Sequence, residues 1–263
     1  SAVAAQETIT NLGFDPEKTY LLLLDADMML EIDPNFNKTT LTADAYSLMQ
    51  HNGDLTYGNT RLIRASLPWK CIGVTHEYWG GNKAKIVPLE TLSIDDWNDG
   101  GAKADKFERD LALLIQGLQE EPKNERYMFY LAQTYKCLNQ YENSNKWYQA
   151  RINAGGWKEE VWYSKLMIGE NYEEMGQWDK ALEAYLEAYS FNPERAEPLY
   201  NIAKHYRLKQ NYLLATQFAR LGKTIPYPKN QILFINDMIY DYGLDEELSI
   251  AAYYTPYKQE GWE

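Results

Sequence analysis

The sequence predicts two parts, an α/β segment over residues 1–104 and an all-α helical-repeat domain over residues 105–263. Short β-rich runs alternate with turn residues up to about residue 100, and helical periodicity dominates beyond that point. Aromatic and small residues recur at a nearly constant spacing in the second part. In the first part, one continuous apolar run leads directly into two aspartates. These three observations define the predicted architecture.

The α/β segment opens with a predicted helix from Ala2 to Leu12, which Gly13 closes. The run Tyr20–Leu24 has no polar alternation, which is typical of a strand buried on both faces. Asn52-Gly53 is a hairpin-type turn signal. Four further short strands are expected, at Ala45–Gln50, Thr60–Arg64, Lys70–Val74 and Lys85–Val87. Strands mixed with a helix predict part of a mixed sheet.

The helical part repeats around three tyrosines, Tyr135, Tyr172 and Tyr206, which are 37 and 34 residues apart. Small residues stand near each tyrosine, as Gly169 does three positions before Tyr172, and they let two antiparallel helices approach closely. The spacing resembles that of tetratricopeptide (TPR) repeats, and the concave face of such repeats would present either the acceptor or a protein partner. A degenerate fourth unit around Tyr240 is expected to cap the stack.

Composition excludes several classes of protein. A net charge of -12 argues against nucleic-acid binding, which needs concentrated Lys and Arg. No apolar run approaches the roughly 20 residues of a membrane span. The cysteines Cys71 and Cys137 fall in different parts and have no ligand-spaced companion, so neither a disulfide nor a zinc site is expected. A reducing compartment, the cytoplasm, is the predicted location.

Asp25-Ala26-Asp27 follows the apolar run directly. Two carboxylates at positions i and i+2, where a strand ends, can both reach one hard divalent cation, which then clamps a diphosphate. The alternative is a pair of solvated loop acids. Because Met28-Met29-Leu30 follows, the acids stand between apolar segments, and this favours metal binding.

Several motifs carry a resemblance to known enzymes. Leu-Leu-Leu-Asp-Ala-Asp, at residues 22–27, resembles the Asp-x-Asp motif of glycosyltransferase family 2, which has the GT-A fold. Residues 75–79, Thr-His-Glu-Tyr-Trp, resemble a His-Glu element downstream in that family. Residues 99–110 and 126–133 resemble family-2 enzymes with fused TPR repeats. Only 24 residues precede Asp25, so we expect the family's nucleotide-binding strands to be missing.

This resemblance implies an activity and its cofactors. A nucleotide sugar, such as a UDP- or GDP-sugar, would donate its sugar to a hydroxyl of a protein or glycan acceptor, with inversion. A Mn²⁺ or Mg²⁺ ion would assist departure of the diphosphate. Asp25 and Asp27 would bind the metal, Asp25 alternatively the ribose of the donor, and His76 could add a neutral ring nitrogen as third ligand. A lone histidine is otherwise usually structural.

An inverting transfer also needs a general base to take the proton of the acceptor hydroxyl. Glu77 is the first candidate, and Asp95, Asp96 and Asp99 are rivals. Asp99 precedes Gly100-Gly101, a loop that could close over the donor.

Three cations near this loop, Lys103, Lys106 and Arg109, could neutralise the leaving diphosphate. Alternatively, Lys106 and Arg109 lie on a solvated helix face. Trp79 and Trp97 could stack on a sugar or pack in the core.

Two rival functions remain. In the first, the repeats bind a protein partner without catalysis, and the α/β part is a vestige of a glycosyltransferase. In the second, the acids belong to a metal-dependent hydrolase, although the histidine-rich ligand set of such sites is missing. Motifs of serine hydrolases, P-loop nucleotidases and dinucleotide-binding dehydrogenases are absent from the sequence.

Overall fold

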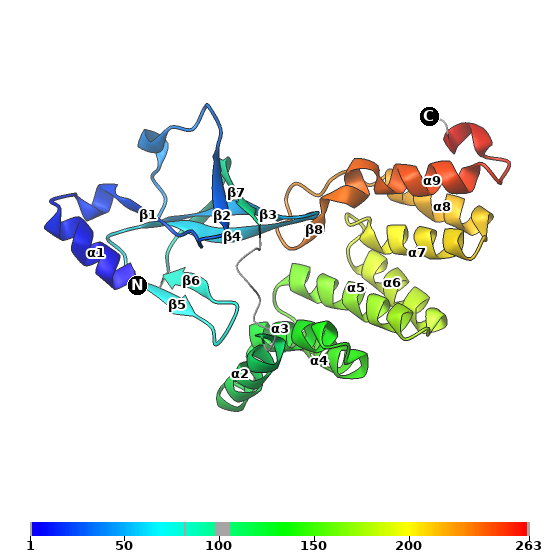
Figure 1. Ribbon diagram of the computed structural model, residues 1–263, viewed down its shortest axis with the longest axis horizontal. Coiled ribbons are helices and arrows are strands. Elements are labelled where there is room, and N and C mark those ends of the chain that lie inside the picture. Colours follow the sequence, from blue (N-terminus) through cyan, green and yellow to red (C-terminus); the bar gives the residue numbers. More distant parts are fainter. Residues whose placement is uncertain (1, 82, 98–105, 262–263) are drawn as a thin grey trace. The chain divides into compact units, whose positions relative to one another are not determined.

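A computed structural model describes residues 2–81, 83–97 and 106–261 of the chain (Figure 1). The chain divides into two compact units, Ser1–Lys106 and Phe107–Glu263. We call them the sheet unit and the repeat unit. The predicted succession of a sheet-containing part and a helical-repeat part is confirmed.

The sheet unit begins with helix α1 (Ala2–Asn11), which ends before Gly13, a residue in the left-handed region at φ +76°. Its main sheet has the strand order β1-β4-β3-β7-β2, and β5 and β6 pair as a separate hairpin. The strands are β1 (Tyr20–Leu22), β2 (Met28–Ile32), β3 (Ala45–Asn52), β4 (Leu55–Arg64), β5 (Trp69–Ile72), β6 (Tyr78–Gly81) and β7 (Ile86–Asp96). Short 3₁₀ turns occupy Pro16–Lys18 and Lys38–Thr40.

The main sheet is mixed. Strands β3 and β4 form an antiparallel hairpin around Gly53, as the Asn-Gly signal predicts, and β3 runs parallel to β7. Successive side chains of a strand point to opposite faces, so Tyr46 and Leu48 enter one core cluster and Ala45 enters another with Trp69. A GT-A arrangement of this sheet stays a prediction.

The first strand differs from its prediction. Strand β1 pairs only with β4 and is therefore an edge strand rather than one buried on both faces. Leu22 and Leu24 are 38% and 40% exposed. Strands β2 and β6 were not predicted, and β7 runs from Ile86 to Asp96, well beyond the predicted Val87.

The repeat unit consists of helical hairpins. Its helices are α2 (Lys106–Glu120), α3 (Glu125–Cys137), α4 (Tyr141–Ala154), α5 (Lys158–Glu174), α6 (Trp178–Phe191), α7 (Glu197–Leu208), α8 (Tyr212–Lys223) and α9 (Leu244–Ala252). Between α8 and α9 lie the short strand β8 (Ile235–Asn236) and a π-helical turn, Ile239–Gly243, and a 3₁₀ turn covers Lys258–Gly261. No helix within the described ranges is long and apolar enough to cross a membrane.

Each hairpin turns at an equivalent residue. The residue between α3 and α4 is Asn139, the one between α5 and α6 is Gly176, and the one between α7 and α8 is Gln210, all with φ between +55° and +70°. These positions repeat with the spacing of the marker tyrosines. Close helix contact uses small residues, because a Cβ on Gly169 would lie 2.5 Å from the ring of Tyr185. These features agree with the predicted TPR-like repeats.

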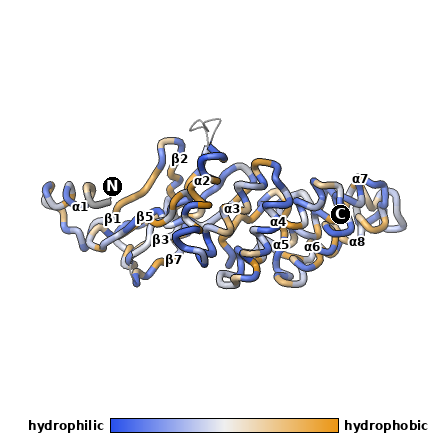
Figure 2. The backbone as a smooth tube through the Cα atoms, turned by 90° about the horizontal axis from the view of Figure 1, so that it is seen from below, coloured by the Kyte–Doolittle hydropathy of each residue, from blue (hydrophilic) through white to orange (hydrophobic). Residues whose placement is uncertain are grey.

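The first helices of the hairpins form one layer. Helix α3 contacts α5 and α7 contacts α9, while α4, α6 and α8 connect successive hairpins from the other layer (Figure 1). We call the surface formed by the first helices α3, α5 and α7 the inner face. Hydrophobic and hydrophilic residues alternate along these helices, as Figure 2 shows.

The predicted cap at Tyr240 lies in the π-helical turn. Its hydroxyl donates to Glu197 and accepts from the N–H of Ala196, at 2.7 and 3.0 Å, so the turn is joined to the start of α7. Helix α9 then packs on α7 and α8.

Candidate functional site

The predicted metal ligands lie on loops of the sheet unit. Asp25 and Asp27 fall between β1 and β2, and His76 and Glu77 lie in the β5–β6 turn. The side chain of Asp25 is 65% exposed and pairs with Arg61 at 3.3 Å, a surface pair that contributes little stability. His76 and Glu77 are exposed, and His76 has a left-handed φ of +49°.

These residues do not form the three-ligand site that the sequence predicts. Among the residues that the structure describes, no group of three or more His, Cys, Asp or Glu side chains is placed to hold a metal ion. His76 lies on the β5–β6 hairpin, which pairs as a separate sheet from the one that contains β1 and β2. Binding of Mn²⁺ or Mg²⁺ by the two aspartates alone, and binding of a nucleotide sugar, stay untested predictions.

The remaining predicted residues are dispersed. Asp99 and Lys103 lie outside the described residues. Lys106 and Arg109 lie three residues apart in the first turn of α2, and Arg109 is exposed. Asp96 accepts hydrogen bonds from Gln50 and Tyr57 at 2.8 and 3.4 Å.

The two tryptophans of the sheet unit have different surroundings. Trp79 packs beside the buried Trp69, as the core-packing alternative predicts, whereas Trp97 is 63% exposed. A cleft of about 670 Å³ on the sheet unit is lined mainly by Leu22, Ile32 and neighbouring apolar side chains. None of the predicted site residues lines this cleft.

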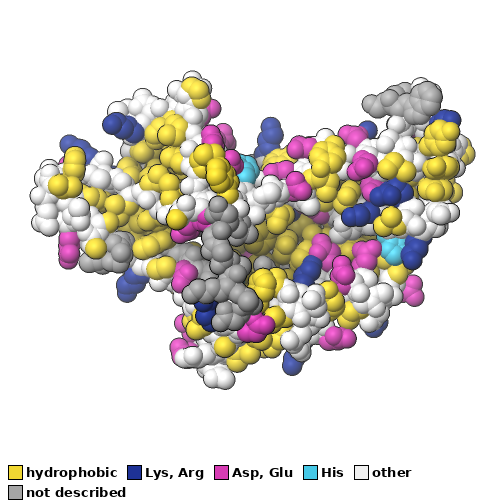
Figure 3. Space-filling model, viewed as in Figure 1, with side chains coloured by type: hydrophobic (Ala, Val, Ile, Leu, Met, Phe, Trp, Pro, Cys, Tyr) yellow, Lys and Arg dark blue, Asp and Glu magenta, His cyan; other side chains and the backbone are white. Residues whose placement is uncertain are grey.

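The inner face of the repeat unit carries charged side chains in pairs. Three pairs cross from one hairpin to the next or to α9, namely Lys136–Glu170, Glu173–His205 and Arg207–Glu247. Glu173 also accepts the hydroxyl of Tyr185 at 2.8 Å, and His205 stacks on Trp178 at 3.3 Å between ring centroids. On the view of Figure 3, acidic and basic side chains are interspersed over the repeat helices.

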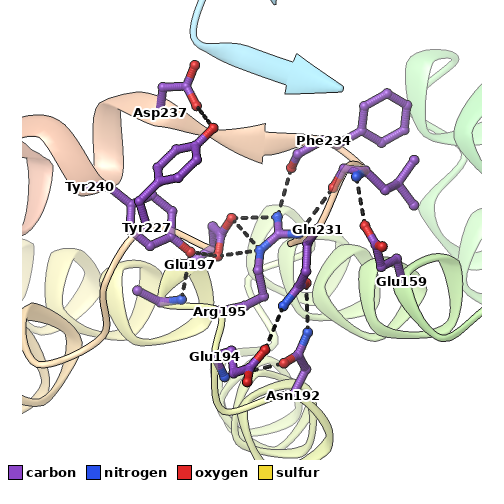
Figure 4. Close-up of polar contacts among 12 residues, drawn as sticks. Glu159, Asn192, Glu194, Arg195, Glu197, Tyr227, Gln231, Phe234, Asp237 and Tyr240 are labelled. Carbon is purple, nitrogen blue, oxygen red and sulfur yellow. Dashed lines mark hydrogen bonds and ion pairs between the residues drawn. The ribbon is translucent and has the colours of Figure 1, made fainter. Parts of the chain in front are cut away.

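An extended stretch of the chain, residues 231–236, lies against the amino-terminal ends of α5 and α7 (Figure 4). One carboxylate oxygen of Glu159 accepts the N–H groups of Ile232 and Leu233, both at 2.8 Å. The guanidinium of Arg195 donates to the carbonyls of Leu233 and Phe234, at 3.1 and 2.9 Å. The stretch is therefore held through its main chain by two side chains of opposite charge.

Arg195 is fully buried. Its guanidinium forms bidentate bonds to Glu197 at 2.6 to 3.1 Å and lies over the ring of Trp162 at 3.9 Å. Burial alone would lower the pKa of Arg195, but the Glu197 carboxylate raises it above the usual value, so Arg195 stays charged. Burial also raises the pKa of Tyr240, which keeps its hydroxyl protonated as a donor to Glu197.

The side chain of Phe234, within this stretch, lies in a pocket formed by aromatic residues. Phe234 stacks on Phe129 with ring centroids 6.4 Å apart, and it lies 5.0 Å from the ring centroid of Tyr163. Upstream, the side chain of Gln231 bonds to those of Asn192 and Glu194. A carboxylate for N–H groups, a guanidinium for carbonyls and an aromatic pocket together can hold an extended peptide.

Sequence reasoning missed this site. Arg195 and Glu197 fall between two predicted repeats, where charged residues are usually solvated. In the sequence, the site shows only as an arginine and a glutamate two residues apart, between Pro193 and Pro198. This pattern does not indicate that the two side chains are buried.

Comparisons with known proteins return structural matches only. No protein-family model and no curated protein matches the chain. A crystal structure of MamA matches 60% of this chain and 83% of its own, at 13% identity and a TM-score of 0.46. MamA from Desulfovibrio magneticus RS-1 covers 60% and 80% at 10% identity and a TM-score of 0.45. YrrB, described as a TPR protein with an unusual peptide-binding site, covers 60% and 73% at 12% identity and a TM-score of 0.42.

These comparisons correct the predicted activity. The structures found to be similar are MamA and YrrB, and the prediction that this chain is a metal-dependent glycosyltransferase with an Asp-x-Asp motif is therefore wrong. The physical reason lies in the sheet unit, where Asp25 and His76 are exposed, Asp27 is half-buried, and no three ligands among the described residues are placed around one ion. Only the TPR-like part of the resemblance is supported.

Proposed function

We propose that this chain is a non-catalytic protein-interaction module whose repeats bind an extended segment of a partner protein on the inner face. The observation that carries the proposal is the stretch 231–236, which the repeat unit already holds by main-chain hydrogen bonds from Glu159 and Arg195. Main-chain bonds supply affinity for an extended peptide, and pockets for side chains supply specificity.

The charges of the inner face support the same function. The side chains of Lys136, Glu170 and Glu173 are 25%, 34% and 36% exposed, so their pairs are accessible to solvent. Such ion pairs stabilise the fold only weakly. A charged group of a partner protein can therefore take the place of one member of a pair with little loss of folding stability. The net charge of -12 argues that the partner is not a nucleic acid.

The test is a selection of random displayed peptides on the immobilised protein, followed by affinity measurement of the enriched peptides by fluorescence anisotropy. Glu173→Lys reverses a charge on the inner face, and Glu183→Lys makes the same change on an exposed position of α6. We expect Glu173→Lys to weaken binding about tenfold or more, equivalent to about 1.4 kcal/mol, and Glu183→Lys to leave it unchanged.

Folding of each variant is checked by circular dichroism, because Glu173 also bonds to Tyr185 and His205. Glu173→Gln, which keeps the size of the side chain, is the milder companion variant. The proposal fails if the folded wild-type protein enriches no peptide, or if the α6 variant weakens binding as much as the inner-face variants do.

A further inference from the structure

We infer that the inner face recognises a peptide of the pattern aliphatic-Leu-aromatic, read through its main chain and its aromatic ring, and that residues 231–234 (Gln-Ile-Leu-Phe) are its internal competitor. This inference rests on the proposed function and names the kind of partner that fits the same face. A partner segment would take the place of the chain's own segment.

The main-chain contacts are of a kind that any extended peptide could make. Consecutive N–H groups of Ile232 and Leu233 converge on Glu159, and consecutive carbonyls of Leu233 and Phe234 converge on Arg195. Neither contact uses a side chain of the segment. A peptide with its backbone in the same place would therefore satisfy the carboxylate and the guanidinium equally well.

The side chains set the pattern. Leu233 is buried, and Ile232 is half-buried. Phe234 is half-buried between Phe129 and Tyr163, and aromatic pairs at these separations add to the energy of burial. A partner would need an aliphatic residue, a leucine and an aromatic residue in succession.

The internal segment occupies the site in a strained backbone conformation. Phe234 has φ +46°, a left-handed conformation that is unfavourable for a bulky aromatic residue. The chain imposes it, because residues 224–238 must connect α8 to the π-helical turn and the hydroxyl of Tyr227 bonds to Asp237 at 2.9 Å. A free peptide has neither connection, so its aromatic residue can relax to a negative φ while the groups before it keep their bonds to Glu159 and Arg195, and only the carbonyl after the ring shifts. Strain in the competitor favours its displacement.

The test uses a fluorescent peptide of residues 229–237, Lys-Asn-Gln-Ile-Leu-Phe-Ile-Asn-Asp, titrated against the whole chain. In Phe234→Ala the competing ring is absent and the pocket of Phe129 and Tyr163 is vacated. We expect this variant to bind the peptide at least tenfold more tightly than the wild type does. Phe191→Ala, which removes an exposed phenylalanine from α6, is the matched control and should bind like the wild type. A peptide with alanine in place of phenylalanine should bind none of the proteins.

A second measurement does not depend on a variant. In the wild-type protein, saturating peptide should accelerate hydrogen exchange at the amides of Ile232 and Leu233, because they leave Glu159 when the segment is displaced. The inference is overturned if folded Phe234→Ala binds the peptide no better than Phe191→Ala does and the exchange of these amides does not change.

Peptides from the display selection separate this failure from failure of the proposed function. If they bind the wild type and Phe234→Ala equally while the 229–237 peptide does not bind, the inner face binds peptides but the segment is no competitor. If neither kind of peptide binds, both proposals fail.

Discussion

Replacing Arg195 with methionine should destabilise the protein severely. The substitution removes a fully buried guanidinium and leaves Glu197, whose side chain is 4% exposed, without its cation. Removing one member of a buried ion pair costs about 3–5 kcal/mol. The carbonyls of Leu233 and Phe234 also lose their donor, at about 1–3 kcal/mol for each group left unsatisfied.

These costs overlap, and the hydroxyl of Tyr240 still donates to Glu197 at 2.7 Å. We therefore expect a loss of about 4–5 kcal/mol in the free energy of unfolding, at the upper end of the range for a buried pair. That is a large share of the roughly 5–15 kcal/mol by which proteins are stable.

The assay is equilibrium unfolding in urea, followed by far-ultraviolet circular dichroism. With a slope of about 2 kcal/mol per molar, the midpoint should fall by about 2 M. In the double variant Arg195→Met/Glu197→Leu no charge is left buried, so it should recover about half of the loss. The unpaired carbonyls account for the remainder. If the single variant loses less than about 1 kcal/mol, or if the double variant is no more stable than the single one, the guanidinium does not hold the segment as we describe.

Three further variants test the packing and the charges of the repeats by the same unfolding assay. Gly169→Ala should lower the free energy of unfolding by about 1–3 kcal/mol, because its Cβ would lie 2.5 Å from the ring of Tyr185. Gly222→Ala should lower it by less, since the nearest neighbour of its Cβ would be the movable end of a leucine side chain. Equal losses for the two variants would contradict this reasoning. Burial raises the pKa of Glu160 above the usual 4.5, against the opposing effect of Arg151, so the folded state favours its protonated form. The stabilising contribution of Glu160 is then complete below pH 4.5 and is lost as the pH rises through the raised pKa. The free energy of unfolding of the wild type should therefore increase relative to that of Glu160→Gln as the pH falls from 7 to 4.5. A difference between the two proteins that does not change with pH would refute the assignment.

The repeats could be predicted because packing imposes their spacing locally. A residue as small as Gly169 is needed where Tyr185 crosses α5, and the two positions are only 16 residues apart. The left-handed turn residue falls at Gly176 in this hairpin, and Asn139 and Gln210 occupy the same place in its neighbours. Each signal lies within one hairpin, and so the sequence contains it within a single repeat.

The sheet unit was predicted less well because strand burial depends on neighbours that are distant in sequence. The run Tyr20–Leu24 has the composition of a central strand, yet β1 pairs on one side only. Strand β2 also lies at an edge, and its sequence Met-Met-Leu-Glu-Ile does not alternate between polar and apolar residues although its burial does. Strand β6 ends in Gly80-Gly81, and glycines weaken a strand signal.

The peptide-holding site could not be predicted because its partners are main-chain groups far away in the sequence. Glu159 accepts N–H groups 73 and 74 residues downstream, and Arg195 donates to carbonyls 38 and 39 residues downstream. Almost every residue type offers the same main-chain N–H and carbonyl groups, so a bond to them requires no particular residue and produces no sequence motif. By contrast, Asp25-Ala26-Asp27 is easily recognised in the sequence, but this motif does not determine whether a third metal ligand lies nearby.

The Arg195–Glu197 pair is best explained by its bonds to the segment. A buried ion pair is rarely more stable than well-packed apolar residues of similar volume, because both charges lose their water. Stability alone therefore gives no reason for a guanidinium at this position. Glu197 occupies the Nε and Nη2 side of the guanidinium, and Nη1 and Nη2 still donate to the carbonyls of Leu233 and Phe234. An apolar side chain could fill the volume but could not orient a peptide backbone, and this orienting role is what a peptide-binding face requires.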